Sequence, residues 1–331
     1  MTQGASREPG LDLFWLQPQV EALRQARASG RFPHALLIQD VPGGGGVQLA
    51  QKAAQVAFCT EEDFPCGRCR ECQRVLAQSH PDLWWVSLEE DATQIKIEQI
   101  RALNEALALT AHGSSASVAI IHPADLLNSN SANALLKTLE EPRSGVLIVL
   151  VAAVSARLPA TVLSRCLRMP VRLPSRAEGA AWLRGQRGAA DWEAVLDIVG
   201  GAPLRALGAD PAQLLALREE TEDQLDGALA GTLDVAPAAE RWADREWFEL
   251  RLHCAENWVT RRLHAQLAGA RDVKELHTAA HLPAGNSSMN IRGLIRLMDA
   301  LYELRRLATT TINKALAVEQ LLWQLRPARK S

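Results

Sequence analysis

Four cysteines lie close together in the first third of the chain: Cys59, Cys66, Cys69 and Cys72. Two residues separate Cys66 from Cys69, and two separate Cys69 from Cys72, a spacing that lets neighbouring sulfurs bind one ion. Gly67 permits a tight turn between Cys66 and Cys69. Four thiolates complete the tetrahedral shell of structural Zn²⁺. Because a closed shell leaves no position for water, we expect one structural zinc ion per chain and no hydrolysis at the metal. A redox dithiol, an iron–sulfur cluster and four unconnected thiols are the alternatives.

A run of glycines lies where a phosphate-binding loop would be expected: Gly43, Gly44, Gly45 and Gly46. It follows an apolar run at residues 34–39 and precedes a helical pattern at 47–58, the strand–loop–helix order of such loops. A working loop continues with Lys and then Ser or Thr, which bind the phosphates and Mg²⁺. Gly46 and Val47 occupy those positions, and Asp40 replaces the first glycine of the motif. We therefore expect no productive binding of ATP, although the glycine backbone could still bind an anion.

The elements that position these residues alternate between strand and helix over about the first 170 residues. Strands are predicted for four apolar runs, at residues 34–39, 83–86, 118–121 and 146–151. Such continuous apolar runs are typical of a parallel sheet that is buried on both faces. A helix is predicted over residues 128–141, where Ala132, Leu135, Leu136 and Leu139 follow helical spacing and Pro142 ends the pattern. His122 follows the third strand, where an ATPase carries its magnesium-binding aspartate.

The strand patterns stop near Pro170 and Pro174, and the rest of the chain is predicted to be helical. Residues 177–207 indicate two or three short helices. From about residue 212 onward, longer stripes of apolar residues follow helical spacing, with a loop expected between His281 and Asn290. The predicted fold class is therefore an α/β domain followed by all-α segments.

Composition excludes several classes of protein. The 331 residues carry 36 Lys+Arg against 38 Asp+Glu, so the net charge of −2 excludes a polycationic coat for DNA. The longest apolar run, residues 146–154, is much shorter than the roughly 20 residues of a membrane-spanning helix, and the first ten residues contain no apolar segment of a secretory signal. We expect a cytoplasmic protein, in which Cys166 and Cys254 are small buried residues.

Several runs of residues resemble the δ′ family of bacterial DNA polymerase III clamp-loader subunits, which belong to the AAA+ class. The similarity lies in the cysteine group and in residues 34–37, 80–82, 133–142, 158–166, 312–314 and 321–322. It implies an AAA+ α/β domain with an inserted zinc knuckle over residues 1–170, a helical lid over 171–211 and a helical collar, used for oligomerisation, over 212–331. It also implies a ring of five subunits, shared with τ or γ and δ, that loads a sliding clamp onto primed DNA.

The resemblance assigns one residue a role in chemistry. In such loaders the δ′ subunit does not hydrolyse ATP, and the arginine of the Ser164-Arg165-Cys166 triplet completes the ATP site of the adjacent τ or γ subunit. A guanidinium that reaches a neighbour's γ-phosphate stabilises charge in the transition state. Judged without the resemblance, Arg165 would be a surface arginine that pairs with a carboxylate. Ser164 and Cys166 are expected to pack and cap.

Other positions depart from the ATPase members of the family. Ala152 and Ala153 stand where a polar residue would sense the γ-phosphate, and Arg205 is one place beyond the position of the lid's sensing arginine. Lys137 is a candidate for contact with phosphate. Two alternative functions are an active AAA+ ATPase, which would need Lys and Ser or Thr at positions 46 and 47, and a zinc-dependent nucleic-acid-binding module.

Overall fold

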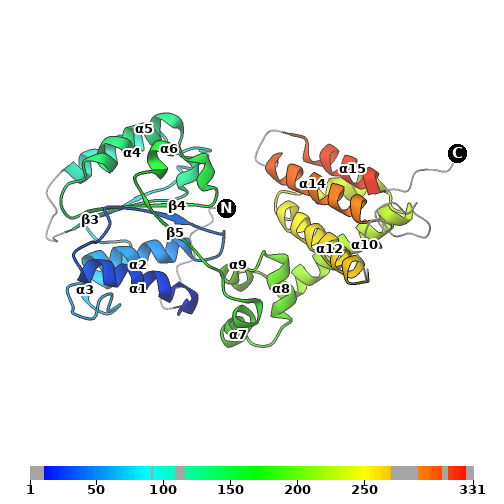
Figure 1. Cartoon of the computed structure of the whole chain (residues 1–331), viewed down its shortest axis with the longest axis horizontal. Coiled ribbons are helices and arrows are strands. Elements are labelled where there is room, and N and C mark those ends of the chain that lie inside the picture. The colour runs from blue at the N-terminus through cyan, green and yellow to red at the C-terminus, as the bar shows by residue number, and fades with distance from the viewer. Residues whose placement is uncertain (1–10, 91, 109–115, 270–289, 308–311, 326–331) are drawn as a thin grey trace. The chain divides into compact units, whose positions relative to one another are not determined.

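The computed structural model describes residues 11–90, 92–108, 116–269, 290–307 and 312–325 (Figure 1). The chain divides into two compact units, the first ending at Pro174 and the second beginning at Ser175. None of the helices in the described ranges is both long and apolar enough to cross a membrane.

A five-stranded parallel sheet forms the centre of the first unit. Its strands are β1 (Ala35–Gln39), β2 (Leu83–Val86), β3 (Ser117–Ile121), β4 (Val146–Ala152) and β5 (Leu167–Pro170), in the spatial order β2-β3-β4-β1-β5. Leu37 lies opposite Leu150 of β4 and Arg168 of β5. Strands β3 and β4 are buried at every residue, as expected for a sheet covered on both faces. The four predicted strands are confirmed.

Strand β5 was not predicted from the sequence. It lies at the edge of the sheet, and three of its four residues are exposed. An edge strand that faces solvent does not need the apolar residues by which the inner strands are recognised.

Helices cover both faces of this sheet. They are α1 (Gln17–Ala28), α2 (Gly46–Phe58), α3 (Arg70–Leu76), α4 (Ile97–Ala108), α5 (Ser129–Glu140) and α6 (Ala160–Leu163), with short 3-10 turns at Phe14–Leu16, Ala124–Leu126 and Ser155–Arg157. Figure 1 shows α1, α2 and α3 on one face of the sheet and α4 and α5 on the other. The core between β1, β3, β4 and α5 includes Leu37, Ile121, Leu150 and Leu135.

The sequence predicts α5 closely. Asn128 caps its first turn, where the side-chain oxygen accepts a hydrogen bond of 2.9 Å from Ser131 N. Ala132, Leu135 and Leu139 are buried against the sheet. The helix stops at Glu140, two residues before Pro142.

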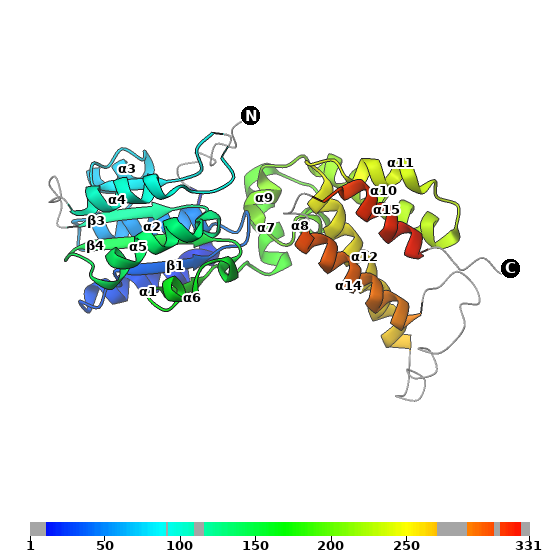
Figure 2. The same cartoon turned by 90° about the horizontal axis from the view of Figure 1, so that it is seen from above.

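The described part of the second unit is helical, as the sequence predicted (Figure 2). Its helices are α7 (Arg176–Arg187), α8 (Trp192–Ile198), α9 (Pro203–Leu207), α10 (Pro211–Ala230), α11 (Val235–Trp242), α12 (Phe248–Gly269), α14 (Ile291–Leu307) and α15 (Lys314–Leu325). A capping box of Ser175 and Glu178 begins α7. Most of the predicted loop, residues 281–289, lies outside the described residues.

Two apolar cores occupy this unit. One joins α7, α8 and α9 to Leu214 and Leu217 of α10 and to Cys254 of α12. The other contains Leu225 and Ala228 of α10 together with residues of α11, α12, α14 and α15. Helix α10 therefore belongs to both cores, and the division into a lid and a collar at residues 211 and 212 stays a prediction.

Candidate functional site

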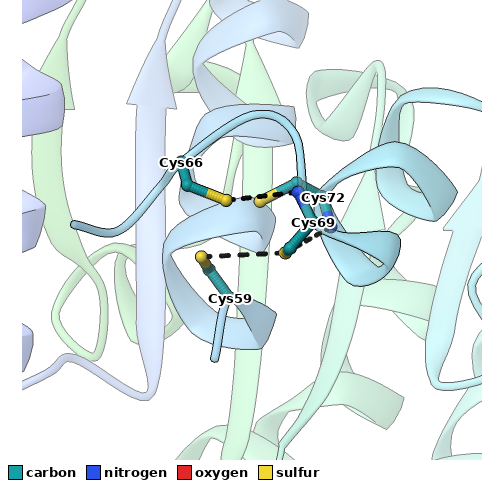
Figure 3. A group of neighbouring side chains, drawn as sticks. All are labelled: Cys59, Cys66, Cys69 and Cys72. Atoms are coloured by element: carbon teal, nitrogen blue, oxygen red, sulfur yellow. Dashed lines mark hydrogen bonds between the residues drawn. The ribbon is translucent and has the colours of Figure 1, made fainter. Parts of the chain in front are cut away.

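The four predicted metal ligands converge in the first unit (Figure 3). Cys59 follows the last residue of α2, Cys69 caps the amino end of α3, and Cys72 lies in the first turn of that helix. Cys66 is in the loop between the two helices. All four Sγ atoms lie within 4.8 Å of one another, so the cluster can hold a metal ion.

Backbone N–H groups donate hydrogen bonds to two of the sulfurs. Cys69 N donates to Cys66 Sγ at 3.2 Å, and Cys72 N donates to Cys69 Sγ at 3.4 Å. Burial raises the pKa of the Cys59 and Cys72 thiols. Burial also tends to raise the pKa of Cys66, but hydrogen bonds from the Arg68 and Cys69 backbone and from the Cys59 and Cys69 thiols outweigh it and lower the pKa of that thiol to about 7. A bound cation would stabilise all four thiolates and release their protons.

A buried histidine, His80, packs against the two helices that carry three of these cysteines or lie next to them. The His80 ring stacks on Phe58 with 3.7 Å between ring centroids, and its Nε2 lies 3.0 Å from Glu71 Oε2 in α3. Asp82 N donates to His80 Nδ1 at 3.1 Å, which leaves the proton of the neutral ring on Nε2. Burial lowers the pKa of His80, and the negative charge of Glu71 partly opposes this effect. The sequence showed residues 80–82 only as part of a resemblance and gave no sign of this contact.

The glycine loop adopts a tight conformation at the start of α2. Gly43 and Gly45 have φ angles of 82° and 107°, values that favour glycine. Gly44, Gly45 and Gly46 are buried. Trp15 Nε1 donates to Gly44 O at 2.8 Å, so the segment before α1 covers the loop. Sequence reasoning missed this cover, because Trp15 is 29 residues away from Gly44.

Arg165 lies on the surface of the first unit, directly after α6 and Ser164. Its Nη2 is 2.6 Å from Glu140 Oε1, and its Nη1 donates to Thr161 O at 2.8 Å. The side chain is 34% exposed, and that of Glu140 is 48% exposed. The residue thus makes the carboxylate pair expected of a surface arginine, and it remains accessible from solvent.

The remaining candidates occupy ordinary positions. Cys166 and Cys254 are buried, and burial raises the pKa of the Cys166 thiol to about 11. Arg205 is half-buried on α9, and Lys137 is exposed on α5. Ala152 is buried at the end of β4, and His122 is half-buried at the end of β3.

Comparison with known proteins shows which proteins the chain is similar to. A family model described as "DNA polymerase III, delta subunit" matches residues 15–175. The chain is 28% identical to "DNA polymerase III subunit delta'" of Pseudomonas aeruginosa, over 93% of this chain and 97% of that protein. It is also 28% identical to the protein of that name from Escherichia coli, over 94% of both chains. The Bacillus subtilis protein of that name is 38% identical over 47% of each chain.

Proteins of other names also match. "DNA polymerase III subunit tau" of Salmonella typhimurium is 32% identical over 49% of this chain and 25% of that protein. A solved structure of a γ subunit-related protein from Thermotoga maritima aligns with a TM-score of 0.45 at 17% identity and covers 92% of this chain and 97% of that one. The family model covers most of the first unit. The δ′ subunits of Pseudomonas aeruginosa and Escherichia coli match through both units, so the chain is similar over nearly its whole length to DNA polymerase III δ′ subunits.

Proposed function

We propose that this chain is a non-hydrolysing stator of a clamp loader, and that Arg165 completes the ATP site of an adjacent τ or γ subunit. The observation that carries the proposal is the position of the guanidinium. It is accessible at the end of the short helix α6, on a residue whose neighbour Cys166 is fixed in the core. The backbone at this point is therefore anchored while the charged end of the side chain can reach outward.

The contacts that hold Arg165 in the isolated chain are weak enough to exchange. Its pair with Glu140 is partly exposed to water, and exposed pairs contribute on the order of 0–1 kcal/mol. A γ-phosphate carries more negative charge than a carboxylate, and two of its oxygens can accept hydrogen bonds from one guanidinium at the same time. In GTPases, an arginine of this kind is worth on the order of 10³ to 10⁵ in rate.

The test is the DNA-stimulated ATPase activity of a loader reconstituted from subunits of one organism. We expect the chain alone to show no ATPase activity. Loaders that contain Arg165→Ala or Arg165→Lys should assemble but hydrolyse ATP more slowly, since Lys cannot reproduce the planar fork of the guanidinium. Glu140→Gln is the matched control, because it removes the partner of Arg165 and keeps the arginine. Full turnover of an assembled Arg165→Ala loader, or hydrolysis by the chain alone, would contradict the proposal.

We propose Zn²⁺ as the metal of the cysteine cluster, with Cys59, Cys66, Cys69 and Cys72 as its ligands. Four sulfurs at roughly 2.3 Å from one tetrahedral zinc would be about 3.8 Å apart. The Sγ atoms of Cys59 and Cys69 are 3.9 Å apart, which supports a fit. A shell of four thiolates is closed, so the ion would link α2 to α3 and serve no catalytic step.

We further propose that α14 and α15 contact neighbouring subunits in a five-subunit ring with τ or γ and δ. Each helix exposes a pair of apolar side chains two turns apart, and each pair therefore lies on one face of its helix. The exposed fractions are 49% and 58% for Ile295 and Tyr302, and 64% and 49% for Leu316 and Trp323. The sliding clamp and primed DNA would be reached through this assembly.

A further inference from the structure

A carboxylate of the chain itself lies at the amino end of α2. Asp40 follows β1, and its backbone N still donates to Ala152 O of β4 at 2.9 Å. Its side chain turns back toward the glycine loop, where Oδ1 accepts a hydrogen bond of 3.0 Å from Gly46 N. The amino end of a helix attracts negative charge, because backbone N–H groups and the positive end of the helix dipole meet there. In nucleotide-binding loops this is the position of a phosphate.

Asp40 and Gly46 depend on each other sterically. A Cβ atom added to Gly46 would lie 2.4 Å from Asp40 Cγ and 2.7 Å from Asp40 Oδ2. Any side chain at position 46, including the lysine of a working loop, would therefore collide with this carboxylate. The aspartate at position 40 and the missing lysine at position 46 are thus linked by packing, whereas the sequence presents them as two separate departures from the motif.

Apolar side chains pack against Gly44 and Gly45. A Cβ on Gly45 would lie 3.1 Å from Leu16 Cδ1, and one on Gly44 would lie 3.1 Å from Leu173 Cδ2. Together with the indole of Trp15 on Gly44 O, these contacts bury Gly44 and Gly45, whereas Val41 and Pro42 on the same loop stay exposed.

Burial raises the pKa of Asp40 to about 6, and hydrogen bonds from the Gly46 and Val41 backbone oppose this effect. At neutral pH the carboxylate is therefore mostly ionised, and its charge repels a polyphosphate at close range.

We propose that Asp40 is an internal anion that fills the phosphate position of the loop and closes it to nucleotides, so that restoring the missing lysine and hydroxyl alone does not restore nucleotide binding. The inference rests on the geometry of the loop and stands whether or not Arg165 acts on a neighbouring subunit.

The first experiment compares two full-length variants by calorimetric titration with Mg-ATP. One variant, Gly46→Lys/Val47→Thr, restores the motif and keeps Asp40, and the other adds Asp40→Gly to these changes. We expect the triple variant to bind Mg-ATP at least about tenfold more tightly than the double variant, a difference of about 1.4 kcal/mol. Equal binding by the two variants, or the absence of binding by a folded triple variant, overturns the proposal.

The second experiment avoids substitutions at the crowded position 46. The amide resonance of Gly46 is followed by NMR while inorganic pyrophosphate is added to the wild type, to Asp40→Gly and to Glu21→Gln. The last variant is a control that removes one exposed negative charge from the same unit. We expect the resonance to move only in Asp40→Gly. Movement in the wild type, or none in Asp40→Gly, overturns the proposal.

Discussion

Replacing Asp40 by Asn should make the stability of the first unit less dependent on pH. Asn keeps an oxygen that can accept the hydrogen bond from Gly46 N, and it cannot ionise. Burial raises the pKa of Asp40 from 3.8 to about 6, so the folded state favours the neutral acid. For a carboxyl group whose pKa is raised by folding, the contribution to stability is fully present below pH 3.8 and is lost as the pH rises through 6.

The size of this effect follows from the shift. About two pKa units at roughly 1.4 kcal/mol each give ~3 kcal/mol in total, of which about 2 kcal/mol falls between pH 4.5 and pH 7.5. The free energy of unfolding of the wild type, relative to Asp40→Asn, should therefore fall by about 2 kcal/mol over this range.

The measurement is urea unfolding of both proteins at several pH values, followed by the NMR resonances of the Trp15, Trp84 and Trp85 indole N–H groups in the first unit. Both proteins share the cysteine cluster and every other titrating group, so the difference between them isolates Asp40, and the metal content is checked at each pH. A difference that stays constant from pH 4.5 to 7.5, or that changes in the opposite direction, would refute the reasoning.

Three further predictions concern other parts of the molecule. Cys69→Ser should abolish retention of one zinc ion per chain, measured by atomic emission, and lower the melting temperature of the first unit; retained zinc with unchanged melting would contradict the metal assignment. His80→Ala should weaken metal retention against a competing chelator, because the ring supports both Phe58 and Glu71, whereas an unchanged rate of zinc loss would show that the contact is incidental. Tyr302→Asp should leave the melting temperature of the isolated chain unchanged and weaken assembly with partner subunits in gel filtration, and normal assembly would exclude this side chain from the interface.

Much of the first unit could be predicted from the sequence because its inner strands are buried on both faces. Residues such as Leu37 and Leu150 must be apolar on either side of the sheet, and this requirement produces runs that can be recognised locally. Strand β5 escaped prediction because Leu167 is 53% exposed and the strand ends at a proline. Its place is set by pairing with β1, which is distant in the sequence.

In the candidate site, too, the features with a local sequence pattern were predicted and the contacts between distant residues were not. The four cysteines were predicted because a metal knuckle uses short spacings along the chain. The contacts of Trp15 with Gly44 and of His80 with Glu71 arise only when separate elements pack together, so no local pattern in the sequence predicts them. Asp40 was seen as a departure from the motif, but its contact with Gly46 depends on how the chain turns after β1.

Helix α10 has a consequence for how the second unit folds. Its 20 residues give it a length of about 30 Å, and Leu214 and Leu225 on this one helix belong to different cores. Arg251 of α12 binds the middle of α10, with Nη1 donating to Thr221 Oγ1 at 3.0 Å and Nη2 lying 2.6 Å from Glu220 Oε2. Neither core can lose its packing without removing support from a helix that the other core also needs. The second unit should therefore unfold in one cooperative step, with similar hydrogen-exchange protection at both ends of α10, despite having two separate cores.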